Sequence, residues 1–181
     1  MNLYDIAKST RASQDKFELW QLLEILDRKP IARILEIGVH RGGMVETLST
    51  VYPHATIVGV DTDFSFLDFE DFIQVQGNSQ DPEIRDQVAS HFGRHGIDFL
   101  FIDGDHHYDA ALKDFEMYAP LVKSGGVIGF HDIQRDPGRV PHHEGVECRR
   151  LFNDLKQKHA SIEIWNGTAG DDGPGIGLLF V

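Results

Sequence analysis

The stretch DFLFIDGDHHYDAALKDFEMYAPLVKSGGVIGFHDI, residues 98–133, places an amphipathic segment between two short apolar runs. These runs, 98–102 and 127–130, are followed by acidic residues that include Asp103 and Asp132. The pattern predicts two neighbouring parallel strands joined by a helix, with both carboxylates at one edge of a sheet. Adjacent strands lie about 4.8 Å apart, so the two charges would repel each other unless a cation lies between them. We therefore expect a ligand site at this edge, where open α/β sheets bind their ligands.

The rest of the chain repeats this alternation of strand and helix, which predicts an α/β fold with a doubly wound, Rossmann-like sheet. Too few residues separate the last two strands for a helical crossover, so we expect them to form an antiparallel terminal hairpin on a mostly parallel, seven-stranded sheet. The other predicted strands are 32–39, 56–60, 72–76, 161–165 and 175–181, and the other predicted helices are 13–28, a segment ending near 52, 82–92 and 144–159.

The composition narrows the class of protein. The 181 residues, 41% of them hydrophobic, predict a single domain over 1–181 that buries its own core. A net charge of −12 without a basic patch argues against nucleic acid as a partner. No apolar stretch could span a bilayer, and no signal peptide is evident, so we expect no membrane association and a cytoplasmic location. Cys148 is the only cysteine, which excludes disulfides and cysteine-based zinc sites within one chain.

A glycine turn follows the first predicted strand. Glu36, Gly38, Gly42 and Gly43 form the pattern Glu-x-Gly-x-x-x-Gly-Gly, which lacks the Gly-x-Gly-x-x-Gly of dinucleotide sites. The glycines would let backbone N–H groups approach a ligand at a helix N-terminus. Glu36 would repel a pyrophosphate but could accept hydrogen bonds from an ammonium group. By itself the turn is as consistent with plain chain reversal as with a ligand site.

Polar residues also end the second and third predicted strands. Asp61 follows Gly38 by 23 residues, a position from which an acid typically binds ribose hydroxyls, although a turn or helix-capping role is equally open. Asn78 and Ser79 could face a nucleobase, or simply form an Asx turn.

Together these motifs resemble class I S-adenosylmethionine-dependent methyltransferases. More narrowly, they are similar to the small metal-dependent O-methyltransferase and cephalosporin-hydroxylase-like group, the methyltransferase domain 24 type. The most specific part of the resemblance is the run 102–108, IDGDHHY, followed by His131-Asp132. The resemblance implies S-adenosyl-L-methionine as cofactor. It assigns the methionine end to Glu36, Gly38, Gly42 and Gly43, the ribose to Asp61, and the adenine to Asn78 and Ser79. Asp103 is expected among the cofactor-binding residues as well.

The resemblance also implies a divalent metal held by Asp103, His131 and Asp132. Relatives often carry an acid at the position of His131. Imidazole suits Mn²⁺ and later transition metals better than Mg²⁺. If His131 is a ligand, the preferred ion can therefore be a transition metal, and otherwise Mg²⁺ or Mn²⁺ has two protein carboxylates here.

Two further residues are candidates for catalysis. Asp105 matches a general base in related sugar methyltransferases, although an Asp beside Gly104 is as consistent with a turn. His106 is expected in the site from the resemblance, whereas His107 fits a polar turn residue. The expected activity is O-methylation of a small-molecule hydroxyl on a sugar, phenol or natural product. The alternatives are a non-catalytic cofactor-binding accessory protein and a hydroxylase-like or hydrolytic enzyme on the same scaffold.

The substrate side of the site is less defined. The segment 134–144 could form a lid, while His142 and His143 within it are more typical of incidental exposed residues. Little sequence precedes the first strand to cover a substrate, so specificity would come from this segment or from a partner subunit in a homo-oligomer. We expect the aromatic side chains of Phe64, Phe66, Phe69 and Phe72 to pack together rather than to bind substrate.

Overall fold

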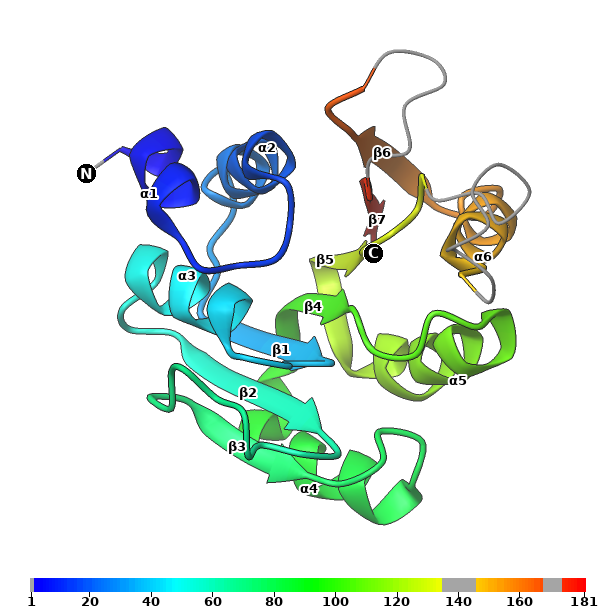
Figure 1. Cartoon of the computed structure of the whole chain (residues 1–181). Coiled ribbons are helices and arrows are strands. Elements are labelled where there is room, and N and C mark those ends of the chain that lie inside the picture. Colours follow the sequence, from blue (N-terminus) through cyan, green and yellow to red (C-terminus); the bar gives the residue numbers. More distant parts are fainter. Residues whose placement is uncertain (1, 135–145, 168–173) are drawn as a thin grey trace.

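Seven strands form one mixed sheet in the computed structural model, which describes residues 2–134, 146–167 and 174–181 (Figure 1). The strand order is β3-β2-β1-β4-β5-β7-β6, with β1 to β5 parallel and with β7 antiparallel to both of its neighbours. This arrangement confirms the predicted doubly wound fold with its terminal hairpin. The strands are β1 (Arg33–Ile37), β2 (Thr56–Asp61), β3 (Ile73–Gln76), β4 (Ile97–Ile102), β5 (Val122–Phe130), β6 (Ala160–Ile164) and β7 (Ile176–Phe180).

Helices cover both faces of the sheet, and each face has its own apolar core. One core contains the buried side chains of α1 (Leu3–Ser9), α2 (Lys16–Leu26) and α3 (Gly43–Val51). The other contains those of α4 (Pro82–Phe92), α5 (Tyr108–Tyr118) and α6 (Cys148–Leu155). Short 3₁₀ turns, η1 (Gly93–His95) and η2 (Ala119–Leu121), follow α4 and α5. Strands β1, β2, β4 and β7 are almost wholly buried, which explains their mostly apolar sequences, whereas β3 and β6 at the two edges of the sheet are partly exposed.

The sheet reverses its order between β1 and β4, and this switch point positions the site. The strand pairing matches Ile37 with Ile102, and Ile102 with Phe130. The residues that come next leave the sheet side by side: the Asp103 N–H donates to the Ile37 carbonyl at 2.8 Å, and the His131 N–H donates to the Ile102 carbonyl at 3.2 Å. Open α/β sheets bind ligands at such a point.

The N-terminal region differs from the sequence-based expectation. A short helix, α1, precedes the predicted one, and α2 is shorter than the range 13–28. Helix α1 is only seven residues long and buries only Ile6 and Ala7, so its sequence carries little periodicity. The side chain of Asp15 accepts hydrogen bonds from two N–H groups in the first turn of α2, which starts that helix after the connection 10–15.

The helix predicted over 144–159 is also shorter. Within the described residues, α6 begins at Cys148, because Glu147 is tied to the neighbouring helix instead: its N–H donates to the His106 carbonyl at 2.8 Å and its carboxylate accepts from the Tyr108 N–H at 3.1 Å. The proposed lid 134–144, with His142 and His143, lies outside the described residues apart from its first position. In the described ranges, no helix combines the length and the apolar character needed to cross a bilayer.

Candidate functional site

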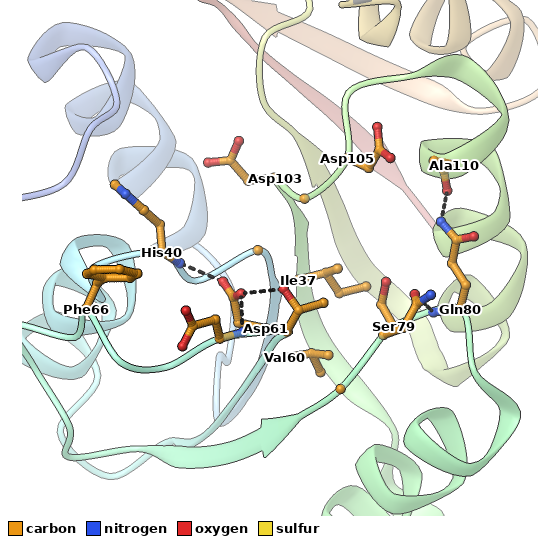
Figure 2. A pocket seen from close by; sticks show the side chains of 16 residues that line it. Ile37, His40, Val60, Asp61, Phe66, Ser79, Gln80, Asp103, Asp105 and Ala110 are labelled. Carbon is orange, nitrogen blue, oxygen red and sulfur yellow. Dashed lines mark hydrogen bonds between the residues drawn. The ribbon is translucent and has the colours of Figure 1, made fainter.

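Two clefts open at the carboxyl edge of the sheet, on either side of the switch point. The larger, of about 640 Å³, lies over the ends of β1, β2, β3 and β4, and Figure 2 shows Asp61, Ser79 and Asp103 around it. The smaller, of about 260 Å³, lies between the connection 10–15, the loop after β1 and the ends of β4 and β5. Gly38, His40 and Asp103 line both clefts, so one elongated ligand could occupy the two.

The glycine turn after β1 is required by close backbone contacts. Gly38 has a φ of 84°, and a Cβ there would overlap the backbone of Asp103. Gly42 has a φ of 82° and starts α3. A Cβ on Gly43 would lie 2.6 Å from the Ala12 backbone nitrogen, so Gly43 is needed where the N-terminal connection crosses α3. The cofactor roles of these glycines stay predictions, although Gly38 and Gly43 line the smaller cleft.

Asp61 holds the glycine turn in place. One oxygen of its carboxylate accepts hydrogen bonds from the backbone N–H groups of Val39, at 2.9 Å, and His40, at 2.8 Å. The other accepts from the Asp63 N–H at 3.1 Å. It also accepts from the Thr62 hydroxyl at 3.5 Å, a long hydrogen bond that a ligand hydroxyl could replace at the larger cleft, which Asp61 lines. The ribose role therefore remains a prediction that this geometry permits.

Asn78 and Ser79 lie in the wall of the larger cleft as expected, but their side chains also serve the fold. The Asn78 side-chain oxygen accepts from the Gln80 N–H at 2.9 Å, which is an Asx turn. The Ser79 hydroxyl donates to Asp114 at 2.7 Å. Sequence reasoning missed Asp114, a buried acid of α5 whose pKa is raised by burial to about 6. Figure 2 also shows the Gln80 amide donating to the Ala110 carbonyl.

Four side chains form an acid–imidazole cluster, defined here as Asp103, His106, His131 and Asp132. His131 Nδ1 lies 3.0 Å from Asp103 Oδ1. His106 Nε2 lies 3.4 Å from the same oxygen and 3.3 Å from Asp132 Oδ2. One ligand atom from each of Asp103, His131 and Asp132 can lie within 4.8 Å of the others. The structure thus brings together the three residues that the sequence predicts as metal ligands.

The charges of this cluster depend on one another. Burial by itself would raise the pKa of Asp103, but the charges and hydrogen bonds of His131 and His106 outweigh it and lower that pKa to about 2. The hydrogen bond to Asp103 in turn raises the pKa of His106. Burial opposes protonation of His131, but the nearby carboxylates still raise its pKa. The histidines occupy the place where a cation would balance the two acids.

The cluster fits a divalent metal ion by its chemistry. Two carboxylates and an imidazole are a common donor set for Mn²⁺, Fe²⁺ and Zn²⁺. His131 Nε2 is buried and has no hydrogen-bond partner in the described part of the chain, so the ring is not fully satisfied by the protein. Asp132 has a left-handed backbone, with a φ of 58°, which turns the chain sharply after β5.

Glu36 is a second buried acid at the edge of the smaller cleft. Its side chain is 1% exposed, and Oε2 has no hydrogen-bond partner among the described residues. Burial, followed by the charges of Asp103 and Asp61, raises its pKa well above the ordinary range. A buried acid of this kind is stabilised when a cationic ligand group arrives.

Asp105 lies in the turn after β4, and its side chain contacts His107. Its Oδ1 accepts from the His107 N–H at 2.9 Å and lies 2.6 Å from His107 Nδ1. The side chain is 54% exposed, and the backbone hydrogen bond from His107 is the main reason that its pKa is lowered. This is the geometry of a turn residue, and a lowered pKa weakens a base. The catalytic role of Asp105 stays a prediction, whereas His106 lies within the cluster.

The N-terminal connection covers the smaller cleft, which sequence reasoning did not anticipate. Arg11, Ser13 and Gln14 line this cleft, and the Gln14 amide donates to Asp103 Oδ2 at 2.7 Å. The connection 10–15 therefore contributes to the site, whereas the expectation that little sequence precedes the first strand to cover a substrate stays a prediction. A polar Ser-Gln pair directly before the helix-capping Asp15 is the only local signal, and it does not identify a partner 89 residues away.

The aromatic residues after β2 divide into two groups. Phe64 and Phe69 pack against Phe72, with ring centroids 6.0 Å and 6.3 Å away. Phe66 is 65% exposed and lines the larger cleft beside His40 (Figure 2). The packing expectation holds for three of the four rings, and Phe66 is the exception.

Comparison with known proteins relates this geometry to one family. Residues 35–133, more than half of the 181, match a family described as a methyltransferase domain. The chain is also 54% identical over 39 residues to an uncharacterized protein of Acanthamoeba polyphaga mimivirus, a match covering 22% of this chain and 18% of the viral protein.

Solved structures share the fold. A Staphylococcus aureus protein provisionally assigned as a caffeoyl-CoA O-methyltransferase has a TM-score of 0.72 at 19% identity, with 98% of this chain and 90% of that chain covered. The O-methyltransferase from Bacillus cereus in complex with SAH has a TM-score of 0.66 at 15% identity, with 99% and 90% covered. MycE, a methyltransferase from the mycinamycin biosynthetic pathway in complex with Mg, SAH and mycinamycin VI, has a TM-score of 0.67 at 20% identity. That match covers 99% of this chain but 54% of MycE, so this chain spans about half of its length. Likeness at these identities shows the fold alone.

Proposed function

The chain belongs to the methyltransferase domain family, and from this premise we propose that it transfers a methyl group from S-adenosyl-L-methionine to a small-molecule hydroxyl with the help of a divalent metal. The observation that carries the proposal is the acid–imidazole cluster beside two joined clefts. One cleft has the size and polar rim for a nucleoside. The other has a buried acid, Glu36, and the cluster itself.

The methyl donor would lie across both clefts, with its nucleoside in the larger one. Asp61 would accept from ribose hydroxyls in place of its long hydrogen bond with Thr62. Asn78 and Ser79 border the place of the base. Glu36 would accept from the ammonium of the methionine part, which relieves the unfavourable burial of its carboxylate. The bound donor supplies the reactive sulfonium methyl group, and the protein supplies orientation.

Asp103, His131 and Asp132 would hold the metal. A divalent ion at this place would lower the pKa of an acceptor hydroxyl and help to orient it. The imidazole of His131 favours Mn²⁺ or another transition metal over Mg²⁺. The solved MycE complex contains Mg.

Of the two predicted catalytic residues, His106 is better placed to receive the hydroxyl proton. Its side chain is 34% exposed and lines the smaller cleft. A metal ion held by Asp103 and Asp132 would take up the charge of these carboxylates, so that they would no longer favour the protonated imidazole and His106 could receive a proton. Replacement by Gln should slow methyl transfer by roughly 10²–10⁴-fold, the usual effect of losing a general base. Asp105→Asn is the matched comparison in the same turn. If Asp105→Asn slows turnover more than His106→Gln, with cofactor and metal binding unchanged, Asp105 is the base.

A thermal-shift titration tests the proposed function directly. S-adenosylhomocysteine at saturating concentration should raise the melting temperature by mass action, and NAD should not. Asp61→Ala should weaken the effect and also lower the melting temperature of the free protein, because this side chain both lines the larger cleft and holds the glycine turn. Equal stabilisation by NAD, or none by S-adenosylmethionine and S-adenosylhomocysteine, would remove the proposal. Methyl transfer to a panel of phenols and sugars then separates an enzyme from a cofactor-binding accessory protein.

A further inference from the structure

Gln14 contributes a largely buried amide to the smaller cleft from a part of the chain outside the matched family region. Its side chain is 4% exposed, and its Nε2 donates to Asp103 Oδ2 at 2.7 Å. The other oxygen of Asp103 faces His131 and His106. The amide therefore determines which carboxylate oxygen points toward the cluster.

The connection that carries Gln14 is braced on several sides. Lys16 Nζ donates to the carbonyls of Thr10, at 3.1 Å, and Ala12, at 2.7 Å. Ala12 lies against Gly43, at the first turn of α3, and its N–H donates to the Thr10 hydroxyl at 3.1 Å. These contacts hold the backbone next to Gln14, so the position of its amide is built into the fold before a ligand arrives.

The remaining atom of this amide has no partner. Gln14 Oε1 is buried and accepts no hydrogen bond from the described residues, and Glu36 Oε2 in the wall of the same cleft is in the same condition. The two guanidinium groups that line the cleft are engaged elsewhere, Arg11 with Glu46 and Arg41 with Asp68. Buried acceptors without donors are unfavourable, and an ammonium group, with three N–H donors, matches them.

We propose that Gln14 is a positioning residue of the site, which orients Asp103 through Nε2 and accepts a hydrogen bond from the ammonium of the methyl donor through Oε1. This inference rests on the proposed function. It assigns to the N-terminal connection a part in binding both the metal and the amino-acid end of the donor.

The test compares Gln14→Leu with Gln21→Leu. Gln21 carries the same side chain on α2 and lines neither cleft, so its replacement controls for the chemical change. Three dissociation constants are measured for each variant by calorimetry: Mn²⁺ alone, S-adenosylhomocysteine, and 5′-methylthioadenosine, which has the nucleoside without the amino-acid part. Gln14→Glu, whose carboxyl group can donate to Asp103 only when it is protonated but keeps an acceptor for the ammonium, is measured in the same way, and the melting temperature of each variant reveals a folding defect.

In Gln14→Leu, Mn²⁺ affinity should fall roughly 10–100-fold, the typical effect of removing the hydrogen-bond partner of a ligand. Affinity for S-adenosylhomocysteine should fall about 10-fold or more, as for a hydrogen bond to a charged group, and that for 5′-methylthioadenosine should not change. In Gln14→Glu, S-adenosylhomocysteine should still bind, because an acceptor for the ammonium remains.

The outcomes separate this inference from the function on which it rests. Equal losses for both nucleosides in Gln14→Leu, or Mn²⁺ and S-adenosylhomocysteine affinities equal to those of Gln21→Leu, overturn the role of Gln14 alone. A wild-type protein that binds neither nucleoside overturns the proposed function and the ammonium contact with it.

Discussion

An aspartate lies at each end of β4, and the two carboxylates differ in the side chains that surround them. Asp98 stands at the amino end with its side chain 1% exposed, and it is neutralised by fixed cations: Arg33 at 3.3 Å and Lys123 in close contact, with the Ala32 N–H donating at 2.9 Å. Asp103 follows the carboxyl end, and its side-chain partners among the described residues are two histidines and the neutral amide of Gln14.

The difference separates an acid with a structural role, Asp98, from one whose partners leave room for the proposed ligand, Asp103. Arg and Lys stay charged at any physiological pH, so Asp98 is satisfied whether or not a ligand is present. Burial would raise the pKa of Asp98, but Lys123, the Ala32 N–H and Arg33 together lower it. Asp103 depends on groups that can release their protons and make room for a metal ion. The partners of Asp98 point to a structural role, and those of Asp103 are compatible with the proposed metal site.

Replacing Asp103 by Asn should have the largest effect on binding. Loss of a ligand should reduce Mn²⁺ affinity by more than about 100-fold, beyond the effect of an outer partner, as measured by calorimetry. The free energy of unfolding without metal should fall by about 2 kcal/mol at neutral pH, because the pKa of Asp103 is lowered from 3.8 to about 2 and Asn cannot replace the charge that His131 and His106 stabilise.

Asp132→Asn is the companion of that variant, since Asn tolerates the left-handed backbone at this position. It should also abolish metal binding in a folded protein. Retained Mn²⁺ affinity in both variants would show that the metal binds at other residues.

Asp98→Asn should lower the stability of the protein and leave its metal affinity unchanged. It leaves Arg33 and Lys123 without a counter-charge at a buried position, and breaking such a pair destabilises a protein by about 3 kcal/mol. This loss of stability lies at the lower end of the usual range, because Arg33 and Lys123 are partly exposed and water can hydrate them again. Urea unfolding measures the loss, and Mn²⁺ affinity should stay unchanged. A stability change below about 1 kcal/mol would contradict the structural role.

Asp114 is a third buried acid, and its side chain accepts a hydrogen bond from the Ser79 hydroxyl. Among the described residues, neither a lysine, an arginine nor a histidine donates a hydrogen bond to it. Its pKa is raised from 3.8 to about 6, chiefly by burial. The unfolded chain loses this proton at lower pH than the folded one, so this contribution to stability is full below pH 3.8 and is lost as the pH rises through about 6.

Asp114→Asn cannot take up the charge and should therefore be more stable than the wild type at pH 7.5, by about 2 kcal/mol, and similar to it at pH 3.5. Urea unfolding at the two pH values gives the difference. A difference that is the same at both pH values would show that Asp114 does not titrate in this range.

Much of the site was predictable because strand ends are encoded locally. Apolar runs that stop at Asp103, His131 and Asp132 predict strands, and parallel strands must bring their ends to one edge. Partners of side chains were not predictable in this way. Nothing near Asp98 in the sequence indicates Arg33 or Lys123, and Gln14 contacts Asp103 only because α1 and α2 fold back over α3.

By itself the sequence determined the doubly wound sheet, the order of its elements and the set of acids and histidines at its carboxyl edge, because these follow from periodicity and from where strands stop. Only the tertiary structure decided that His106 lies within the acid–imidazole cluster, that Asp105 turns to His107, and that Gln14 completes the wall of the smaller cleft. The physical reason is that a hydrogen bond between side chains depends on the donor–acceptor distance and on the exclusion of water. Packing of segments far apart in the chain sets both of these.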